Sequence, residues 1–248
     1  MISVRIASTL ALGCLAFAGP AQAQARLEPP RAVLELFTSQ GCSSCPAADK
    51  LLGELSNDPS LVTITLPVDY WDYLGWKDTL ALKGHAARQR AYAGTRGDRE
   101  VYTPQLVVNG VAHVNGRDKP AIDRAIAQSR KQPALLGLAV TTSIADNKLT
   151  VGVPAKDNHT PGEIWLCPVT KAVPVKIGRG ENRGHTITYT NVARRWVKLG
   201  DWTGKAQTFS VPLSELQSDE IDSVMVLVQS GAAGAPKVML GAAQLAVR

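Results

Sequence analysis

The stretch Glu35–Asp49, ELFTSQGCSSCPAAD, contains two cysteines, Cys42 and Cys45, separated by two residues. An apolar run typical of a β-strand precedes the pair, and residues 46–52 after it have a helical pattern. The pair is therefore expected at a strand-to-helix junction. The free N–H groups and the positive dipole end of a helix N-terminus favour a thiolate, which lowers the pKa of the Cys42 thiol. This arrangement indicates a redox dithiol, in which Cys42 attacks and Cys45 resolves.

Two other roles fit the same spacing. Zinc sites also use such cysteine pairs, but they need a second ligand pair, and neither Cys14 nor Cys167 supplies one. A periplasmic metal-binding or chaperone module could instead hold copper or zinc through the dithiol, with His85 or His113 as a further ligand. A purely structural disulfide is the third possibility. The redox interpretation needs neither a metal nor another cofactor.

Residues 1–23 have the pattern of a signal peptide. Arg5 supplies a positive charge, residues 6–18 are apolar but too short to span a membrane, and a small-residue cleavage site ends at Ala23. Cleavage there leaves 26 basic and 21 acidic residues, a net charge of +5. We expect a periplasmic or secreted bacterial protein, in a compartment where disulfides form. No later segment approaches about 20 apolar residues, so no transmembrane segment is expected in the mature chain.

A first domain is expected over residues 24–133, with helices and strands in alternation. Asn109-Gly110 is typical of a hairpin turn between two short strands. A proline is tolerated at the start of a strand but not in its middle, so Pro104 marks where one of these strands begins. The expected elements are strand 32–37, helix 43–55, strand 61–68, helix 77–92, strands 106–108 and 111–114, and helix 118–131.

This order, with the dithiol after the first strand and Thr103-Pro104 before the third, resembles the thioredoxin fold. The resemblance implies a cis peptide bond before Pro104. It also implies that Pro104 lies against the cysteines, so that Thr103 and Pro104 join Cys42 and Cys45 as catalytic residues.

Four longer motifs are spread over nearly all of the mature chain: GCSSCP, VDYWDYLGWKD, VYTPQLVVNG and GENRGHTITYTNVARRW. They are similar to those of one family of exported bacterial proteins of unknown function, the domain-of-unknown-function family 1223. The resemblance implies membership of this family and no particular activity.

An aromatic and acidic cluster, Asp69, Tyr70, Trp71 and Asp72, follows the second strand. In an open α/β sheet, ligands bind beyond the carboxyl ends of the strands. That rule places the cluster on the same side as Cys42, where it could form a substrate-binding wall for a partner polypeptide. The alternative is that these side chains pack under the second helix.

Three further positions each have two interpretations. Glu35 could be a buried proton acceptor for Cys45 or a strand residue that faces solvent. Cys167 is expected to be free and buried, but it could take part in the redox chemistry. The polar segment Gly180–His185, bracketed by glycines, could be a binding loop or a long hairpin connection.

Residues 134–248 contain short alternating runs separated by turn residues, with a domain boundary near Pro133. About seven such strands suggest an antiparallel sandwich. The expected fold class is therefore an α/β thioredoxin-like domain followed by an all-β, antiparallel sandwich-like domain. The alternative is that these strands extend the first domain. The expected strands are 138–143, 148–153, 163–169, 186–189, 195–199, 206–211 and 223–229.

These observations predict an exported thiol–disulfide oxidoreductase that acts on protein or small-molecule disulfides through its dithiol. Its partner would be a protein that carries a disulfide or a thiol. The basic residues are scattered and do not alternate with aromatic residues, so no nucleic-acid partner is expected. The chain also contains no glycine-rich nucleotide-binding motif and no hydrolase triad motif.

Overall fold

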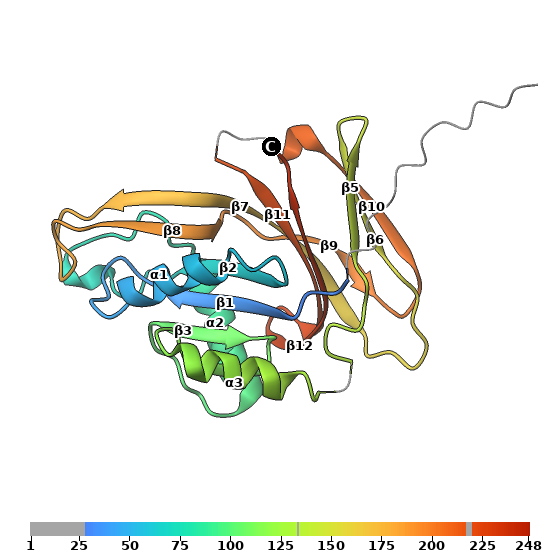
Figure 1. Ribbon diagram of the computed structural model, residues 1–248, viewed down its shortest axis with the longest axis horizontal. Coiled ribbons are helices and arrows are strands. Elements are labelled where there is room, and N and C mark those ends of the chain that lie inside the picture. Colours follow the sequence, from blue (N-terminus) through green and yellow to red (C-terminus); the bar gives the residue numbers. More distant parts are fainter. Residues whose placement is uncertain (1–27, 133, 217–219) are drawn as a thin grey trace, which may run out of the picture.

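The computed structural model of this 248-residue protein describes residues 28–132, 134–216 and 220–248 (Figure 1). The predicted signal peptide and Pro133 lie outside the described residues. Among the residues described, no helix combines the length and the apolar character needed to cross a membrane.

The helices and strands alternate in the first half of the chain, and strands dominate the second half. In chain order they are β1 (Ala32–Thr38), α1 (Pro46–Leu55), β2 (Leu61–Pro67), η1 (Asp72–Leu74), α2 (Lys83–Arg96), β3 (Gln105–Val108), β4 (Ala112–Asn115), α3 (Lys119–Ser129), β5 (Thr141–Ala145), β6 (Lys148–Val153), β7 (Gly162–Lys176), β8 (Thr186–Ala193), β9 (Val197–Trp202), β10 (Gln207–Pro212), η2 (Leu213–Glu215), β11 (Ser223–Ala232) and β12 (Ala235–Ala246).

The predicted elements up to residue 131 are all present, with shifted helix starts. α1 begins at Pro46, because proline is well suited to the first helical position, where no N–H is needed. α2 begins at Lys83, six residues later than predicted. The reason is Asp78, whose carboxylate accepts the backbone N–H of Leu80 at 2.9 Å and so holds a turn in place of the first helical residues.

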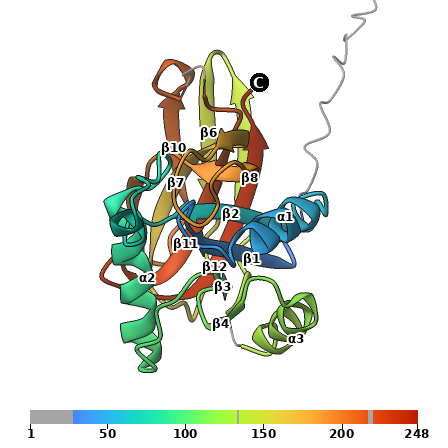
Figure 2. The same cartoon turned by 90° about the vertical axis from the view of Figure 1, so that its left-hand side faces the viewer.

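Strand β1 is central in this part of the molecule and is buried on both faces. It pairs in parallel with β2 and antiparallel with β3, which pairs with β4. Leu34 and Leu36 of β1 pack with α1 and α3, whereas Val33 and Phe37 pack with α2. α1 and α3 therefore cover one face of the sheet and α2 the other, as Figure 2 shows.

The predicted fold class is wrong, because the chain does not form a thioredoxin-like α/β domain followed by a separate β-sandwich. One mixed sheet of nine strands runs through both halves, in the order β12-β11-β7-β8-β2-β1-β3-β4, with β9 also paired to β7. The second half thus extends the sheet of the first, which was the alternative interpretation. Strands β5, β6 and β10 form a separate three-stranded sheet.

The two halves join where β8 runs parallel to β2, with Val192 opposite Thr65. Thr65 Oγ1 donates to the backbone carbonyl of Thr190 at 2.5 Å, and the buried amide of Asn191 donates to Thr63 Oγ1 at 2.9 Å. These buried threonines and this asparagine lie within otherwise apolar strands. Their pairing across the junction satisfies polar groups that would be costly to bury alone.

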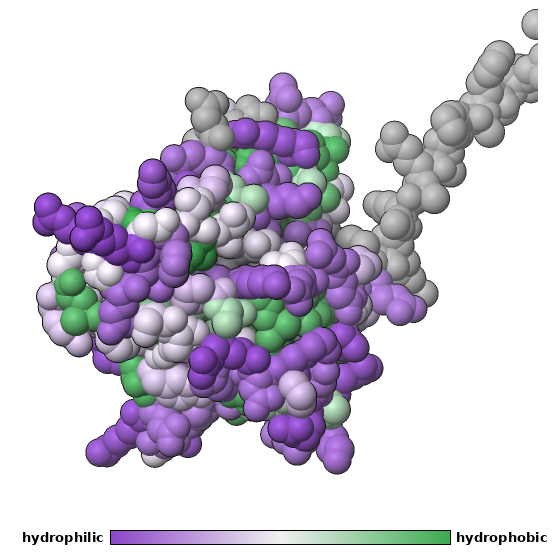
Figure 3. All heavy atoms as spheres, turned by 60° about the vertical axis from the view of Figure 1, so that its left-hand side comes forward, coloured by the Kyte–Doolittle hydropathy of each residue, from purple (hydrophilic) through white to green (hydrophobic). Residues whose placement is uncertain are grey.

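The small sheet covers one face of the far end of the large sheet (Figure 1). Leu149 and Val151 of β6 belong to one buried cluster with Leu166 of β7 and with Val224 and Val226 of β11. The local packing is therefore sheet on sheet. The face of the molecule in Figure 3 is mostly polar, and its apolar side chains form small separate patches.

Candidate functional site

Cys42 and Cys45 form a disulfide between the end of β1 and the start of α1, with their Cα atoms 5.4 Å apart. Cys45 is the N-cap residue of α1, and its carbonyl accepts the N–H groups of Ala48 and Asp49 at 2.8 and 3.0 Å. The predicted strand-to-helix junction is confirmed. Cys42 is 2% exposed and Cys45 is 0% exposed, so the disulfide lies just under the surface.

Trp71 joins the cysteine loop to the segment that contains Pro104. A Cβ atom added to Gly41 would lie 3.0 Å from Trp71 Cβ, so only glycine fits there without displacing Trp71. The Trp71 indole N–H donates to Thr103 Oγ1 at 2.8 Å. The Thr103–Pro104 peptide bond is cis, as expected. Three of the predicted site segments are thus adjacent in space.

Pro104 itself is buried beside the first turn of α1. A Cβ atom added to Gly116 would lie 3.1 Å from Ala48 Cβ and 3.4 Å from Pro104 Cβ, and the Gly116 N–H donates to the Pro104 carbonyl at 3.0 Å. Ala48 is three residues after Cys45. Pro104 therefore lies on the same side of the sheet as the helix that carries the cysteine pair.

The other residues of the predicted aromatic and acidic cluster mainly hold their own loop. Tyr70 donates from its hydroxyl to Gln89 Oε1 at 3.2 Å, and the Asp72 carboxylate accepts the N–H of Asp78 at 3.0 Å. The Asp69 carbonyl accepts the N–H of Asp72 at 3.1 Å. None of these bonds reaches the cysteines.

Tyr73 was not predicted as a site residue, yet it is a largely exposed aromatic side chain in this loop. Its ring stacks on that of Trp71 with centroids 6.3 Å apart, and 78% of the residue is exposed. Its position inside the motif YWDYLGW was the signal available in the sequence. Tyr73 and Trp71 together present an aromatic surface next to the cysteine loop.

The residues just before Cys42 are held from a second side. Gln40 donates its backbone N–H to Asp78 Oδ2 at 2.8 Å, and its side-chain oxygen accepts the indole N–H of Trp76 at 2.8 Å. Gln40 and Asp78 are buried. The cysteine loop is therefore fixed by polar contacts and is not a loose surface segment.

Residues 177–185, the tip between β7 and β8, reach the same loop from more than 130 residues away. Asn182 donates from its side-chain amide to the carbonyls of Gln40 and Cys42, each at 2.9 Å. Glu181 Oε2 accepts the backbone N–H of Ser43 at 3.2 Å. The sequence left two interpretations for the segment Gly180–His185, a binding loop or a hairpin connection. In the structure it is a hairpin connection that contacts the cysteine loop.

Two buried carboxyl groups lie beneath the site. Burial raises the pKa of Asp49 to about 8, and the charge of nearby Asp78 adds to the shift. Burial likewise raises the pKa of Asp78 to about 6. The nearby Thr38 hydroxyl opposes part of the rise in the pKa of Asp49, and within the described residues the nearby Tyr189 hydroxyl has no hydrogen-bond partner. Asp49 was not predicted as a site residue.

Glu35 of β1 is buried, but it is paired with a cationic side chain of α2. Arg88 Nε donates to Glu35 Oε1 at 2.7 Å, and the Tyr92 hydroxyl donates to Oε2 at 2.5 Å. Cys167 is free and buried near this network, and burial raises the pKa of its thiol. The expectation of a free, buried Cys167 is confirmed.

The histidines considered as metal ligands have other partners. His85 Nδ1 donates to the Pro67 carbonyl at 2.8 Å, and burial lowers its pKa to about 4. His113 lies 3.3 Å from Asp98 and 2.9 Å from the Tyr102 hydroxyl. In the part of the chain that the structure describes, no group of three or more His, Cys, Asp and Glu side chains is arranged to hold a metal ion.

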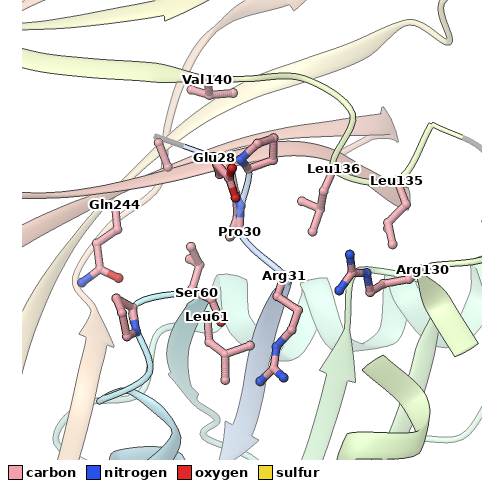
Figure 4. Close-up of a pocket in the computed structure, with 15 residues that line it drawn as sticks. Glu28, Pro30, Arg31, Ser60, Leu61, Arg130, Leu135, Leu136, Val140 and Gln244 are labelled. Atoms are coloured by element: carbon pink, nitrogen blue, oxygen red, sulfur yellow. The ribbon is translucent and has the colours of Figure 1, made fainter. Parts of the chain in front are cut away.

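A cavity of about 840 Å³ lies at the opposite end of β1 and β2 from the cysteines (Figure 4). Arg31, Leu61, Arg130 and Leu136 are among the residues that line it. Arg31 precedes β1 and Leu61 begins β2, whereas Cys42 follows the end of β1. We assign the candidate site to the disulfide and not to this cavity, because the disulfide carries reactive sulfur atoms.

The fold and the site define a class of protein: one continuous mixed sheet with a disulfide-bonded C-x-x-C pair at a strand-to-helix junction. The chain belongs to the family described as "Protein of unknown function (DUF1223)", whose model matches residues 33–229. The predicted family is thereby confirmed. A search among curated proteins finds no match.

Two solved structures are similar to this one. The crystal structure of a protein from Agrobacterium tumefaciens is 30% identical, covers 88% of this chain and 95% of its own, and has a TM-score of 0.79. HBP35 of Porphyromonas gingivalis is 12% identical, covers 88% of this chain and 75% of its own, and has a TM-score of 0.58. The second similarity is one of fold alone.

Proposed function

We propose that this protein is an exported thiol–disulfide oxidoreductase that acts through Cys42 and Cys45. The observation that carries the proposal is the position of the pair, with Cys45 as the N-cap of α1 and Cys42 in the loop before it. The positive end of the helix dipole stabilises a thiolate and so activates a cysteine.

In the disulfide form, a partner thiolate attacks Sγ of Cys42, the Cys42–Cys45 bond breaks, and Cys45 leaves as a thiolate. A second partner thiolate then attacks the partner's sulfur in the mixed disulfide and releases Cys42. Two electrons pass from the partner to the dithiol, and the partner gains a disulfide. The reverse sequence reduces a partner disulfide, with Cys42 attacking and Cys45 resolving.

The substrate class is a polypeptide or a small molecule that carries a thiol or a disulfide. Trp71 and Tyr73 support a polypeptide partner, because an exposed aromatic surface beside the cysteine loop can hold an extended chain. Thr103 and Pro104 complete the site from the segment that Trp71 contacts. The signal-peptide pattern of residues 1–23 supports a periplasmic or secreted location.

The test is the reduction potential of the pair, measured on the mature protein in graded thiol–disulfide buffers with alkylation to count reduced cysteines. We expect a reversible transition between about −270 and about −120 mV, the span from thioredoxin to a strong periplasmic oxidant. A pair that stays oxidised below about −300 mV is structural, and this result would overturn the proposal.

Trapping gives an independent readout. Cys45→Ser should accumulate mixed disulfides between Cys42 and partners, whereas Cys42→Ser should trap none and lose turnover. Cys167→Ser is the matched control, because the Cys167 thiol is free and buried. Equal trapping by the Cys42→Ser and Cys45→Ser variants would contradict the assigned roles.

A further inference from the structure

The tip between β7 and β8 is a compact turn with its own hydrogen bonds. The Ile177 N–H donates to the His185 carbonyl at 2.9 Å, and the Gly184 N–H donates to the Ile177 carbonyl at 2.8 Å. Gly180 and Gly184 have positive φ angles of 77° and 85°, which glycine adopts without strain. The tip therefore presents Glu181 and Asn182 in a defined orientation.

The tip is also packed against the cysteine loop through Trp76. A Cβ atom added to Gly178 would lie 2.9 Å from Trp76 Cζ3, so this glycine allows the close approach of the indole ring. The same indole donates to Gln40, two residues before Cys42. The contact is thus built from apolar packing and hydrogen bonds together.

Asn182 is 3% exposed and uses its side-chain amide on two backbone carbonyls that flank Gly41. An amide nitrogen has two hydrogens, so these two bonds use its full donor capacity. The Cys42 carbonyl also accepts the Cys45 N–H at 3.1 Å. Asn182 therefore holds the backbone of the segment Gln40–Cys42 in place.

Glu181 places a carboxylate oxygen 3.2 Å from the Ser43 N–H, the backbone donor directly after Cys42. A backbone N–H next to a cysteine stabilises the thiolate when it donates to the sulfur. A carboxylate that occupies this N–H removes a donor and adds a negative charge close to the sulfur. Both effects disfavour the thiolate.

We propose that the β7–β8 tip sets the redox behaviour of the dithiol, with Asn182 as the positioning residue and Glu181 as the residue that disfavours the Cys42 thiolate. A less stable thiolate destabilises the reduced state, so Glu181 shifts the equilibrium toward the disulfide and makes the pair more reducing. This inference rests on the proposed function in one respect, that the pair exchanges with external thiols.

The test is the equilibrium constant of the pair with glutathione, measured for the wild type and for Glu181→Gln. The glutamine side chain keeps an oxygen that can accept the Ser43 N–H but removes the charge. We expect the constant to shift by about threefold toward the dithiol, equal to about 14 mV. The pH at which Cys42 reacts with iodoacetamide at half its maximal rate should fall in the same variant.

Glu54→Gln is the matched control, because Glu54 is an exposed carboxylate near the other end of the helix that follows Cys45. It should leave both readouts unchanged. The effect of Glu181→Gln should shrink in 1 M salt, where the screening length is about 3 Å.

Asn182→Ala should speed reduction of the disulfide by glutathione by about tenfold, because the loop loses two hydrogen bonds that hold its backbone. Should Asn182→Ala fail to fold, Glu181→Gln decides the question alone.

The two proposals fail in different ways. If the wild-type pair stays oxidised at every ratio of reduced to oxidised glutathione, the proposed function is refuted, and this inference with it. A wild-type pair that exchanges reversibly, while Glu181→Gln changes neither the equilibrium constant nor the alkylation profile at low salt, refutes this inference alone.

Discussion

Arg88 on α2 donates from Nε to Oε1 of Glu35 on β1 at 2.7 Å, and the two side chains are 11% and 1% exposed. Tyr92 donates to the same carboxylate, and Gln229 of β11 accepts from Arg88 Nη2 at 2.8 Å. The Arg88 guanidinium also lies over the ring of Trp196, 4.7 Å from its centroid. This network ties the first half of the chain to the second at the centre of the fold.

Arg88→Ala should lower the free energy of unfolding by about 3–5 kcal/mol, because it leaves the Glu35 carboxylate buried without its cation. The measurement is urea denaturation of the oxidised protein. Arg90→Ala is the control: Arg90 is exposed on the same helix and its replacement should cost less than about 0.5 kcal/mol. If Arg88→Ala lowered the free energy of unfolding by less than about 1 kcal/mol, the network would not stabilise the contact between the two halves of the chain.

Replacing both Cys42 and Cys45 by serine should destabilise the protein only modestly. The bond closes a short loop, with a sequence separation of 3, and so removes little entropy from the unfolded chain. The chain-entropy relation gives about 2 kcal/mol for such a loop. Thermal denaturation of the double variant measures the loss. Complete unfolding of the variant at 25 °C would contradict this expectation and favour a structural role for the disulfide.

Asp49→Asn should stabilise the protein more at pH 8 than at pH 5. The pKa of Asp49 is raised from 3.8 to about 8 by burial, so above about pH 4 the unfolded chain has lost a proton that the folded chain keeps. Stability of the wild type therefore falls as the pH rises between these two values. At about 1.4 kcal/mol for each pH unit, the three pH units from 5 to 8 amount to about 4 kcal/mol, which the variant should gain relative to the wild type.

Urea denaturation of the oxidised protein at both pH values checks this expectation. Asp146→Asn, in the exposed β5–β6 turn, is the matched control and should show no such pH-dependent gain. Equal pH profiles for Asp49→Asn and the wild type would contradict the shifted pKa of Asp49.

Trp71→Phe should lower the free energy of unfolding by about 1 kcal/mol, because it removes the 2.8 Å hydrogen bond to Thr103. In a double-mutant cycle with Thr103→Val, the double variant should lose less than the sum of the single losses. Additive losses would mean that the two side chains do not interact in solution.

Tyr73→Ala separates partner binding from stability. Tyr73 is largely exposed, so its replacement should change the free energy of unfolding by less than about 0.5 kcal/mol. Under the proposed function it should also slow exchange with a protein disulfide but not with glutathione, which is too small to need the aromatic surface. A change in the glutathione rate would show that Tyr73 acts on the dithiol itself.

Local patterns predicted the elements of the first half well, for physical reasons. Helical spacing in the sequence places Ile122, Ala125, Ile126 and Ser129 on one side of the third helix, and these are the residues that α3 buries. Asp118 caps this helix by accepting the Ala121 N–H at 2.9 Å. A helix with an apolar stripe, a capping residue and a following turn is specified by neighbours in the sequence.

Strand pairing in the second half could not be predicted in the same way. β7 extends through Lys176, past the predicted end at residue 169, because its second half gains β8 as a partner. β12, at Ala235–Ala246, was not predicted, since its alanines and glycine form a weak strand pattern. Its hydrogen bonds to β11 supply the stability that its own residues do not.

The sequence by itself determined the chemistry and the local structure of the site: the two cysteines, the strand before them, the helix after them and the family. Tertiary structure alone decided which distant residues meet at that site, including Asn182 and Glu181. It also decided that one nine-stranded sheet joins both halves of the described chain. The physical reason is the distance along the sequence over which each kind of interaction acts. Helix capping and apolar periodicity act within a few residues, whereas the parallel pairing of β8 with β2 brings together segments more than 120 residues apart.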